Sequence, residues 1–223
     1  METGIRYMFM NKKDNELHDT FTLFLKAPNS LKAITEEMDP YIRERGEAIY
    51  FNKELAKDPT SNKYIYYLEF VPELIKLKQE IDSLVKNSFE NHILFQDCKN
   101  KAFSHFMNKE HYSKQLAFFC DFEMKVGIKG ANDNQIEDKL NNIINLFKCL
   151  NNKMIFQFEY AKKLSDRLIQ NKTQSLVAEK SLISKLKAEQ GVTFVNKMTS
   201  MLQDLDTSRT EMDIFRQQNH RVI

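Results

Sequence analysis

Glycine is scarce in this chain, and its scarcity restricts the fold more than any other feature of the sequence. Only 5 of the 223 residues are glycine and 4 are proline. All-β folds use Asn-Gly or Asp-Gly pairs in their hairpin turns, and the sequence contains neither pair. Phosphate-binding loops and dinucleotide-binding folds need several glycines at fixed spacing, and these five match neither G-x-G-x-x-G nor G-x-x-x-x-G-K-[ST]. The sequence therefore predicts an all-α fold.

Apolar residues recur every three or four positions in the segments after residue 14, a pattern typical of amphipathic helices. Asn132 and Gln135 have the spacing of a capping box at the start of the clearest of them. Gly127 and Gly191 each stand where a helix is expected to end. The pattern predicts helices over residues 14–26, 30–56, 74–85, 93–107, 113–126, 136–150, 155–169, 176–187 and 194–205, and a final helix that begins at residue 212.

Four other features predict breaks in the helical pattern. Residues 1–13 show no periodicity, so we expect an irregular start. Pro40 lies inside an apolar stripe and is expected to bend or restart that helix. The stretch Lys57 to Tyr67 predicts a loop and a domain boundary, and Pro72 is expected in the first turn of the next helix.

Charge and cysteine content limit the possible partners and compartments. The 33 basic and 31 acidic residues leave a net charge of +2, which is too small to indicate nucleic acid or an anionic membrane as a partner. The three cysteines form no C-x-x-C motif, as is usual in a reducing compartment. No signal-peptide pattern and no long apolar run is present, so we expect the cytoplasm and nucleus.

No group of residues has the spacing of a catalytic or metal site. His105 and His111 flank Glu110, but they lack the i, i+4 spacing with which two histidines on a helix bind one metal ion. Cys98 and Cys120 lie on apolar helical stripes, which favours a structural role over a nucleophilic one. The residues alone thus predict a helical protein that works by contact, with no catalytic residue, metal or cofactor.

Three linked stretches, beginning at Phe156, match a known set of motifs in order. The motifs are F-x-x-x-Y-x-x-x-L-A-K-R-L-L, then I-S-K-L-K-x-x-x-G, then F-x-x-K-[LM]-x-x-M-x-x-D. They are typical of the cullin family, the scaffolds of multisubunit RING ubiquitin ligases, which the chain resembles from about residue 15 onward. The signature residues that carry the resemblance are Phe156, Tyr160, Leu164, Arg167, Leu168, Ile183, Lys185, Leu186, Gly191, Lys197 and Met201.

The resemblance implies an architecture and a function. It implies a segment of a cullin-repeat helical stalk followed by part of a four-helix bundle. Residues 1–57 would end the preceding repeat, residues 58–150 would form the last repeat, and residues 151–223 would start the bundle. The implied function is that of a non-catalytic scaffold in a cullin-RING E3 ubiquitin ligase. Ser165 and Asp166 depart from the Ala-Lys of the first motif and reverse a charge there.

The family's partners bind outside the matched stretches. Adaptors and substrate receptors bind an N-terminal repeat, and the RING-box subunit binds a region that follows the bundle. We therefore expect a middle fragment, a truncated gene product or a partial gene model. In each case we expect the chain to capture no RING-box subunit and to leave one apolar face of its bundle uncovered. The alternative is a stand-alone or degenerate helical protein-interaction module that does not support ubiquitin transfer.

Overall fold

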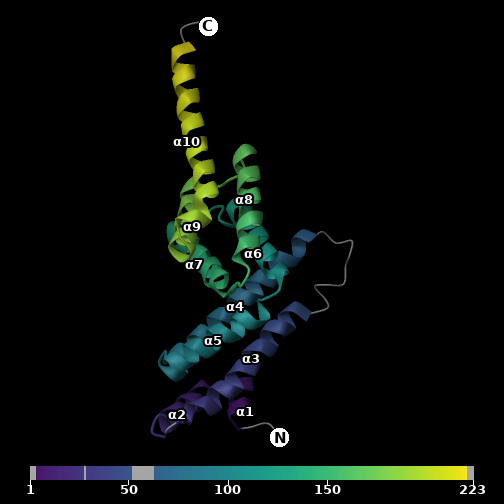
Figure 1. Ribbon diagram of the computed structural model, residues 1–223, viewed down its shortest axis with the longest axis vertical. Coiled ribbons are helices and arrows are strands. Elements are labelled where there is room, and N and C mark those ends of the chain that lie inside the picture. The colour runs from purple at the N-terminus through teal and green to yellow at the C-terminus, as the bar shows by residue number, and fades with distance from the viewer. Residues whose placement is uncertain (1–3, 28, 52–62, 220–223) are drawn as a thin grey trace. The chain divides into compact units, whose positions relative to one another are not determined.

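The structure, a computed structural model, describes residues 4–27, 29–51 and 63–219 (Figure 1). Every regular element in these ranges is helical, which confirms the all-α prediction. Within the same ranges, no helix combines the length and apolar character needed to cross a membrane. The helices are α1 (Gly4–Met10), α2 (Asp14–Phe24), α3 (Leu31–Phe51), α4 (Lys63–Phe89), α5 (Ile93–Phe106), α6 (Glu110–Phe122), α7 (Asp133–Cys149), α8 (Lys153–Ile169), α9 (Leu176–Gln190) and α10 (Val192–Asn219), and a π-helical turn, Glu123–Gly127, continues α6.

The chain divides into two compact units. Unit 1 comprises residues 1–112 and 149–152, and unit 2 comprises residues 113–148 and 153–223. Unit 1 therefore contains α1 to α5, and unit 2 contains most of α6 and all of α8, α9 and α10. This division follows contacts in space, whereas the three-part division above concerns family repeats and stays a prediction.

Aromatic rings form the core of unit 1. The rings of Phe89 and Phe95 stack with their centroids 4.0 Å apart, and Phe21 meets both rings edge-on. These contacts join α2, α4 and α5. Phe9 of α1 stacks on Tyr41 of α3, with centroids 5.2 Å apart, and extends the same core. Offset and edge-to-face aromatic contacts add stabilisation beyond the burial of apolar area.

The prediction of an irregular start was wrong for residues 4–10, which form α1. Phe9 is 1% exposed and packs on both Tyr41 and Phe89. A seven-residue helix is too short to display a periodicity and too short to be stable alone. Its stability comes from the burial of Phe9, a tertiary contact that a local pattern does not contain.

The sequence predicted a helix restart, a helix start and a loop at positions that lie inside continuous helices. The predicted restart at Pro40 was wrong, because α3 runs through it, with Met38, Tyr41 and Ile42 buried around it. Pro72 lies inside α4 rather than in its first turn, because α4 already begins at Lys63. The predicted loop is therefore wrong from residue 63 onward, and its earlier part lies outside the described residues. Apolar packing offsets the hydrogen bond that each proline removes.

The helix predicted to start at residue 212 is instead part of α10. This helix runs without interruption from Val192 to Asn219. No glycine or proline occurs between these two residues, so no local signal ends the helix.

Three of the local start and stop signals are confirmed in unit 2. The Asn132 side chain accepts from the Gln135 backbone N–H at 2.9 Å, and the Gln135 side chain accepts from the Asn132 N–H at 3.0 Å. Gly191 ends α9 with a φ of 83°, a conformation that favours glycine. Gly127 also ends its helical run, but its φ is not positive. The Glu123 carboxylate occupies the space that a Cβ would need.

The core of unit 2 forms where α7, α8 and α10 meet. The Phe147 ring lies 5.0 Å from that of Phe156 and 5.7 Å from that of Phe194, measured between centroids. In α9, Leu182, Ile183 and Leu186 are buried, whereas Lys187 is exposed.

We predict that Leu186→Asp is far more destabilising than Lys187→Asp. Leu186 is 0% exposed, so an unpaired carboxylate there is expected to cost several kcal/mol, roughly 3 or more. Position 187 faces water, and its substitution is expected to cost less than about 0.5 kcal/mol. Thermal melts of the two variants followed by circular dichroism test this, and equal melting temperatures would contradict the orientation of α9.

Candidate functional site: a buried charge network in unit 2

Helix α8 contains the first signature motif and buries one face of it in the interior of unit 2. Phe156, Tyr160, Leu164 and Arg167 recur every three or four residues and are each 0% exposed. Three of these side chains are apolar or aromatic, but the fourth carries a full positive charge. An unpaired charge at such a position is too costly to persist, so partners must lie within hydrogen-bond distance of Arg167.

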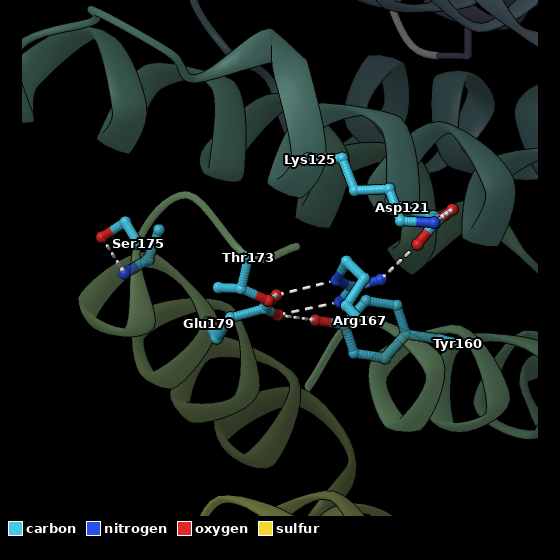
Figure 2. A network of polar contacts seen from close by, with 8 residues as sticks. Asp121, Lys125, Tyr160, Arg167, Thr173, Ser175 and Glu179 are labelled. Atoms are coloured by element: carbon cyan, nitrogen blue, oxygen red, sulfur yellow. Dashed lines mark hydrogen bonds and ion pairs between the residues drawn. The ribbon is translucent and has the colours of Figure 1, made fainter. Parts of the chain in front are cut away.

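Glu179 of α9 is the main partner of Arg167 (Figure 2). Arg167 Nε donates to Glu179 Oε1 and Nη2 donates to Oε2, both at 2.9 Å. This two-point contact is the strongest geometry available to a guanidinium and a carboxylate. Tyr160 donates to Oε2 at 2.9 Å and Thr173 donates to Oε1 at 3.1 Å. Each carboxylate oxygen of Glu179 therefore accepts two hydrogen bonds.

Asp121 of α6 binds the remaining side of the guanidinium. Arg167 Nη1 donates to Asp121 Oδ1 at 2.8 Å, and Lys125 donates to the other oxygen, Oδ2, also at 2.8 Å. We call Asp121, Lys125, Tyr160, Arg167, Thr173 and Glu179 the Arg167 network. It contains two cations and two carboxylates, so its formal charges cancel.

The loop between α8 and α9 positions Glu179. Ser175 caps α9, and its hydroxyl accepts from the Ala178 N–H at 3.2 Å. Glu179 then lies in the first turn of α9, where the helix dipole favours a negative charge. The Gln174 N–H donates to the Met124 carbonyl at 3.0 Å, which attaches this loop to the π-helical turn. The network thus joins α6, α8, α9 and the loop.

The network fixes the protonation states of Arg167 and Tyr160. Burial opposes the charge of Arg167, but Tyr160 and Glu179 outweigh it and raise the pKa of the guanidinium above its usual value. Burial, reinforced by Glu179, raises the pKa of the Tyr160 phenol well above its usual value. Tyr160 therefore stays a neutral hydrogen-bond donor and Arg167 stays charged. Neither group is poised to exchange a proton near neutral pH.

Another buried charge, Glu123, lies in the π-helical turn itself. Glu123 is 6% exposed, and Lys139 of α7 donates to its Oε2 at 2.6 Å and to the Gly127 carbonyl at 2.8 Å. A side chain at position 127 would collide with this carboxylate. The pair attaches α7 to the turn in the way that the Arg167 network attaches α8 and α9 to α6.

The remaining signature residues lie in different environments. Lys185 pairs with Glu137 of α7 and donates to Asn141 at 2.9 Å near the surface. Leu168 and Met201 are half-buried, Ile183 and Leu186 are buried, and Lys197 is exposed. The structure therefore brings Tyr160 and Arg167 together in one site and spreads the others over unit 2. That any of them has a functional role stays a prediction.

Sequence reasoning missed Asp121, Lys125, Thr173 and Glu179 as members of this site. The signal was the position of Arg167 on the buried face of an amphipathic helix, which requires a buried acid elsewhere. In the residues that the structure describes, no three His, Cys, Asp or Glu side chains converge as metal ligands would.

Comparison with known proteins places the chain in a family. The model of the cullin alpha solenoid domain matches residues 1–212. The chain is 32% identical over 211 residues to Cullin-3A of Arabidopsis thaliana, covering 94% of this chain and 28% of that protein. It is 30% identical over 221 residues to Cullin-3 of Caenorhabditis elegans and 28% identical over 219 residues to Cullin-4A of Homo sapiens. These matches cover 96% and 97% of this chain and 27% of each relative.

This chain belongs to the cullin family. It spans a little more than a quarter of the length of these relatives. The match over residues 1–212 includes unit 1, unit 2 as far as residue 212, and the whole Arg167 network.

We predict that Arg167→Ala destabilises unit 2 by about 3–5 kcal/mol, because it leaves the Glu179 carboxylate buried without a countercharge. The double variant Arg167→Met with Glu179→Gln removes both charges, and Gln still accepts from Tyr160. The free energy of unfolding that the double variant loses is expected to be smaller, by at least about 1 kcal/mol, than the sum of the losses in Arg167→Met and Glu179→Gln.

Denaturant unfolding measures the loss in Arg167→Ala, and the same measurement on the unsubstituted chain, Arg167→Met, Glu179→Gln and the double variant gives the coupling between the two side chains. Lys185→Ala is the matched control, because its ion pair with Glu137 is near the surface and is worth at most about 1 kcal/mol. Additive losses in the double variant would show that the Arg167 and Glu179 side chains do not interact as described.

The environment of Cys98 predicts a thiol that reacts slowly with alkylating reagents near neutral pH. Burial, with a smaller contribution from Asp39, raises the pKa of Cys98 to about 11. The thiolate is the reactive form, so raising the pKa lowers its population near neutrality. We expect alkylation of Cys98 by iodoacetamide to speed up about tenfold per pH unit between pH 8 and pH 10. Peptide mapping by mass spectrometry measures this rate, with free cysteine as the control. A plateau below pH 9 would contradict the raised pKa.

Proposed function

We propose that this chain forms part of the scaffold of a cullin-RING E3 ubiquitin ligase and acts in ubiquitin-dependent protein degradation. The observation that supports this most is where the first signature motif lies. Phe156, Tyr160, Leu164 and Arg167 form the interior of unit 2 and face no solvent. A residue that binds a ligand or partner must be reachable from solvent, and none of these four side chains is. Here they specify a rigid helical body, as a scaffold requires.

The physical demand on a scaffold is fixed geometry. Helices packed against neighbours along their length hold distant partners at a set separation. Buried, fully satisfied polar networks further restrict a fold to one arrangement. The Arg167 network has that character, since it joins residues 46 positions apart in sequence, and the Glu123–Lys139 pair joins the π-helical turn to α7. In this proposal the chain contributes geometry, and the ligase reaction is performed by other subunits.

The partners of the proposed complex are a RING-box subunit, an adaptor and a substrate receptor, and the proposed compartments are the cytoplasm and nucleus. The chain matches only 28% of Cullin-3A. We therefore propose that these partners dock on parts of a cullin other than the segment that this chain matches.

A chimera tests the proposal. The matched segment of Arabidopsis Cullin-3A is replaced by this chain, and ubiquitin transfer is measured in a reconstituted reaction with activating enzyme, conjugating enzyme and RING-box subunit. We expect the chimera to retain at least about a tenth of the parental activity, because a scaffold segment is replaceable by one of equal geometry. The isolated 223-residue chain is expected to give no ubiquitin chains and no capture of the RING-box subunit.

Two further proteins make the result decisive. A chimera with Lys187→Asp is the control for substitution as such, and one with Arg167→Ala is expected to lose activity with its fold. A chimera that melts like the parent but transfers no ubiquitin would favour the stand-alone interaction module. Ubiquitin chains that depend on the isolated segment would show that it carries a docking site for the RING-box subunit.

A further inference from the structure

Unit 1 contains a cleft with a charged rim and an apolar floor. Its volume is about 440 Å³, and it is lined by α1, the turn after α1, α2, α3 and α4, all of which belong to unit 1. This volume lies within the usual range of small-molecule sites. The side chains of the floor are each less than a tenth exposed. They are Phe9, Leu17, Tyr41, Ile81 and Leu84.

Three cations lie around this floor. Lys12 follows α1, Arg45 lies on α3 and Lys76 lies on α4. Charges on the rim of a concave site with apolar walls act more strongly than the same charges on a flat surface, because water screens them less completely. The cleft is therefore a place where three separate segments of the chain direct positive charge at one volume.

Two carboxylates neutralise part of this charge. Arg45 Nη2 donates to Glu80 Oε2 at 2.7 Å, and Lys12 Nζ lies 3.5 Å from the same oxygen. The hydrogen bond from Arg45 outweighs partial burial and lowers the pKa of Glu80, so Glu80 is ionised at neutral pH. Asp14 is the other carboxylate of the rim, and it opposes an anion. Three cations and two carboxylates leave a positive charge in the cleft.

Two donors in the cleft have no acceptor among the described residues. The Tyr41 hydroxyl accepts from Arg45 Nη1 at 3.1 Å, but it donates its own hydrogen to no described residue. Tyr41 is only 6% exposed, and a buried donor of this kind normally has an acceptor. Lys76 is exposed and forms no ion pair or hydrogen bond with a described residue. Free donors beside an excess of positive charge match an anion that carries several oxygens.

The rim side chains have room to move. A smaller cleft of about 210 Å³ between α3 and α4 is also lined by Arg45, Lys76 and Glu80. These side chains thus lie between two hollows, and Arg45 and Lys76 can turn towards a ligand without displacing the core. A phosphate group offers both of them charged acceptor oxygens.

We propose that this cleft binds a small organic phosphate, with the phosphate group at Arg45, Lys76 and the Tyr41 hydroxyl and the organic part over the apolar floor. Binding competes with the Arg45–Glu80 ion pair, because the same guanidinium serves both anions. The site is independent of the proposed scaffold function, because it lies within unit 1 and requires no ligase subunit.

Isothermal titration calorimetry of the 223-residue chain tests the proposal, with phenyl phosphate as the probe. We expect one site per chain with a Kd of about 1 mM or lower. Inorganic phosphate lacks the organic part and phenol lacks the charge, so each is expected to bind at least about tenfold more weakly. Absence of binding up to about 10 mM phenyl phosphate, or equal binding of either comparator, would overturn the proposal.

Substitutions on the rim test the site by the sign of their effects. Lys76→Gln and Arg45→Gln are each expected to raise the Kd of phenyl phosphate about fivefold or more. Glu80→Gln releases Arg45, and Asp14→Asn removes a negative charge, so each is expected to lower the Kd about twofold or more. Thermal melts verify that each variant folds. Weaker binding by Glu80→Gln would contradict the competition between Glu80 and the ligand.

Lys86→Gln is the matched control for Lys76→Gln. Lys86 is exposed on the same helix but does not line the cleft, and its substitution removes the same charge. At constant ionic strength its Kd is expected to change less than about twofold. Equal weakening by the two variants would show that phenyl phosphate responds to net charge alone and would overturn the proposal.

Protection from acetylation locates the bound ligand. Phenyl phosphate at about ten times its Kd is expected to slow the acetylation of Lys76 by acetic anhydride about fivefold or more and to leave Lys86 unchanged. Peptide mapping by mass spectrometry measures both rates in one sample. Acetylation of Lys76 at the same rate with and without phenyl phosphate would place the ligand elsewhere and overturn the proposal.

Discussion

The ion pair between Arg167 and Glu179 is the interaction on which the packing of unit 2 depends. Both side chains are fully buried, and neither is tolerable there without the other. Because Asp121 shares the guanidinium, the pair also fixes where α6 lies relative to α8 and α9. Apolar contacts alone permit several helix registers, whereas a two-point contact between a guanidinium and a carboxylate permits one. The network therefore fixes the register of these helices, and the aromatic core packs around them in that register.

The features that the sequence predicted correctly are those that short-range physics decides. Helix periodicity, the Asn132 capping box and the left-handed Gly191 each depend on residues a few positions apart. The burial of Leu186 and the exposure of Lys187 follow from the same spacing. The motif that indicated the family also contained Tyr160 and Arg167, two members of the buried network.

The features that the sequence did not predict depend on contacts between distant segments. Asp121 is 46 residues from Arg167, and nothing near it marks it as the partner. Helix α1 exists because Phe9 reaches Tyr41 and Phe89, and α3 continues through Pro40 because its neighbours are buried. In each case the free energy of burial exceeds a local preference of about 1–3 kcal/mol. Local sequence patterns indicate such preferences, but they do not indicate the tertiary contacts whose burial outweighs them.

The contact between α3 and α5 limits how the sequence of unit 1 can change during evolution. A Cβ on Gly46 would come within 2.5 Å of the Phe106 ring, and Phe106 is itself only 3% exposed. Position 46 therefore accepts a larger residue only in a lineage where position 106 has become smaller. Either change alone leaves a clash or a cavity. The two positions should vary together among relatives that keep this helix pair, which makes them a measure of how closely the packing of α3 on α5 has been retained.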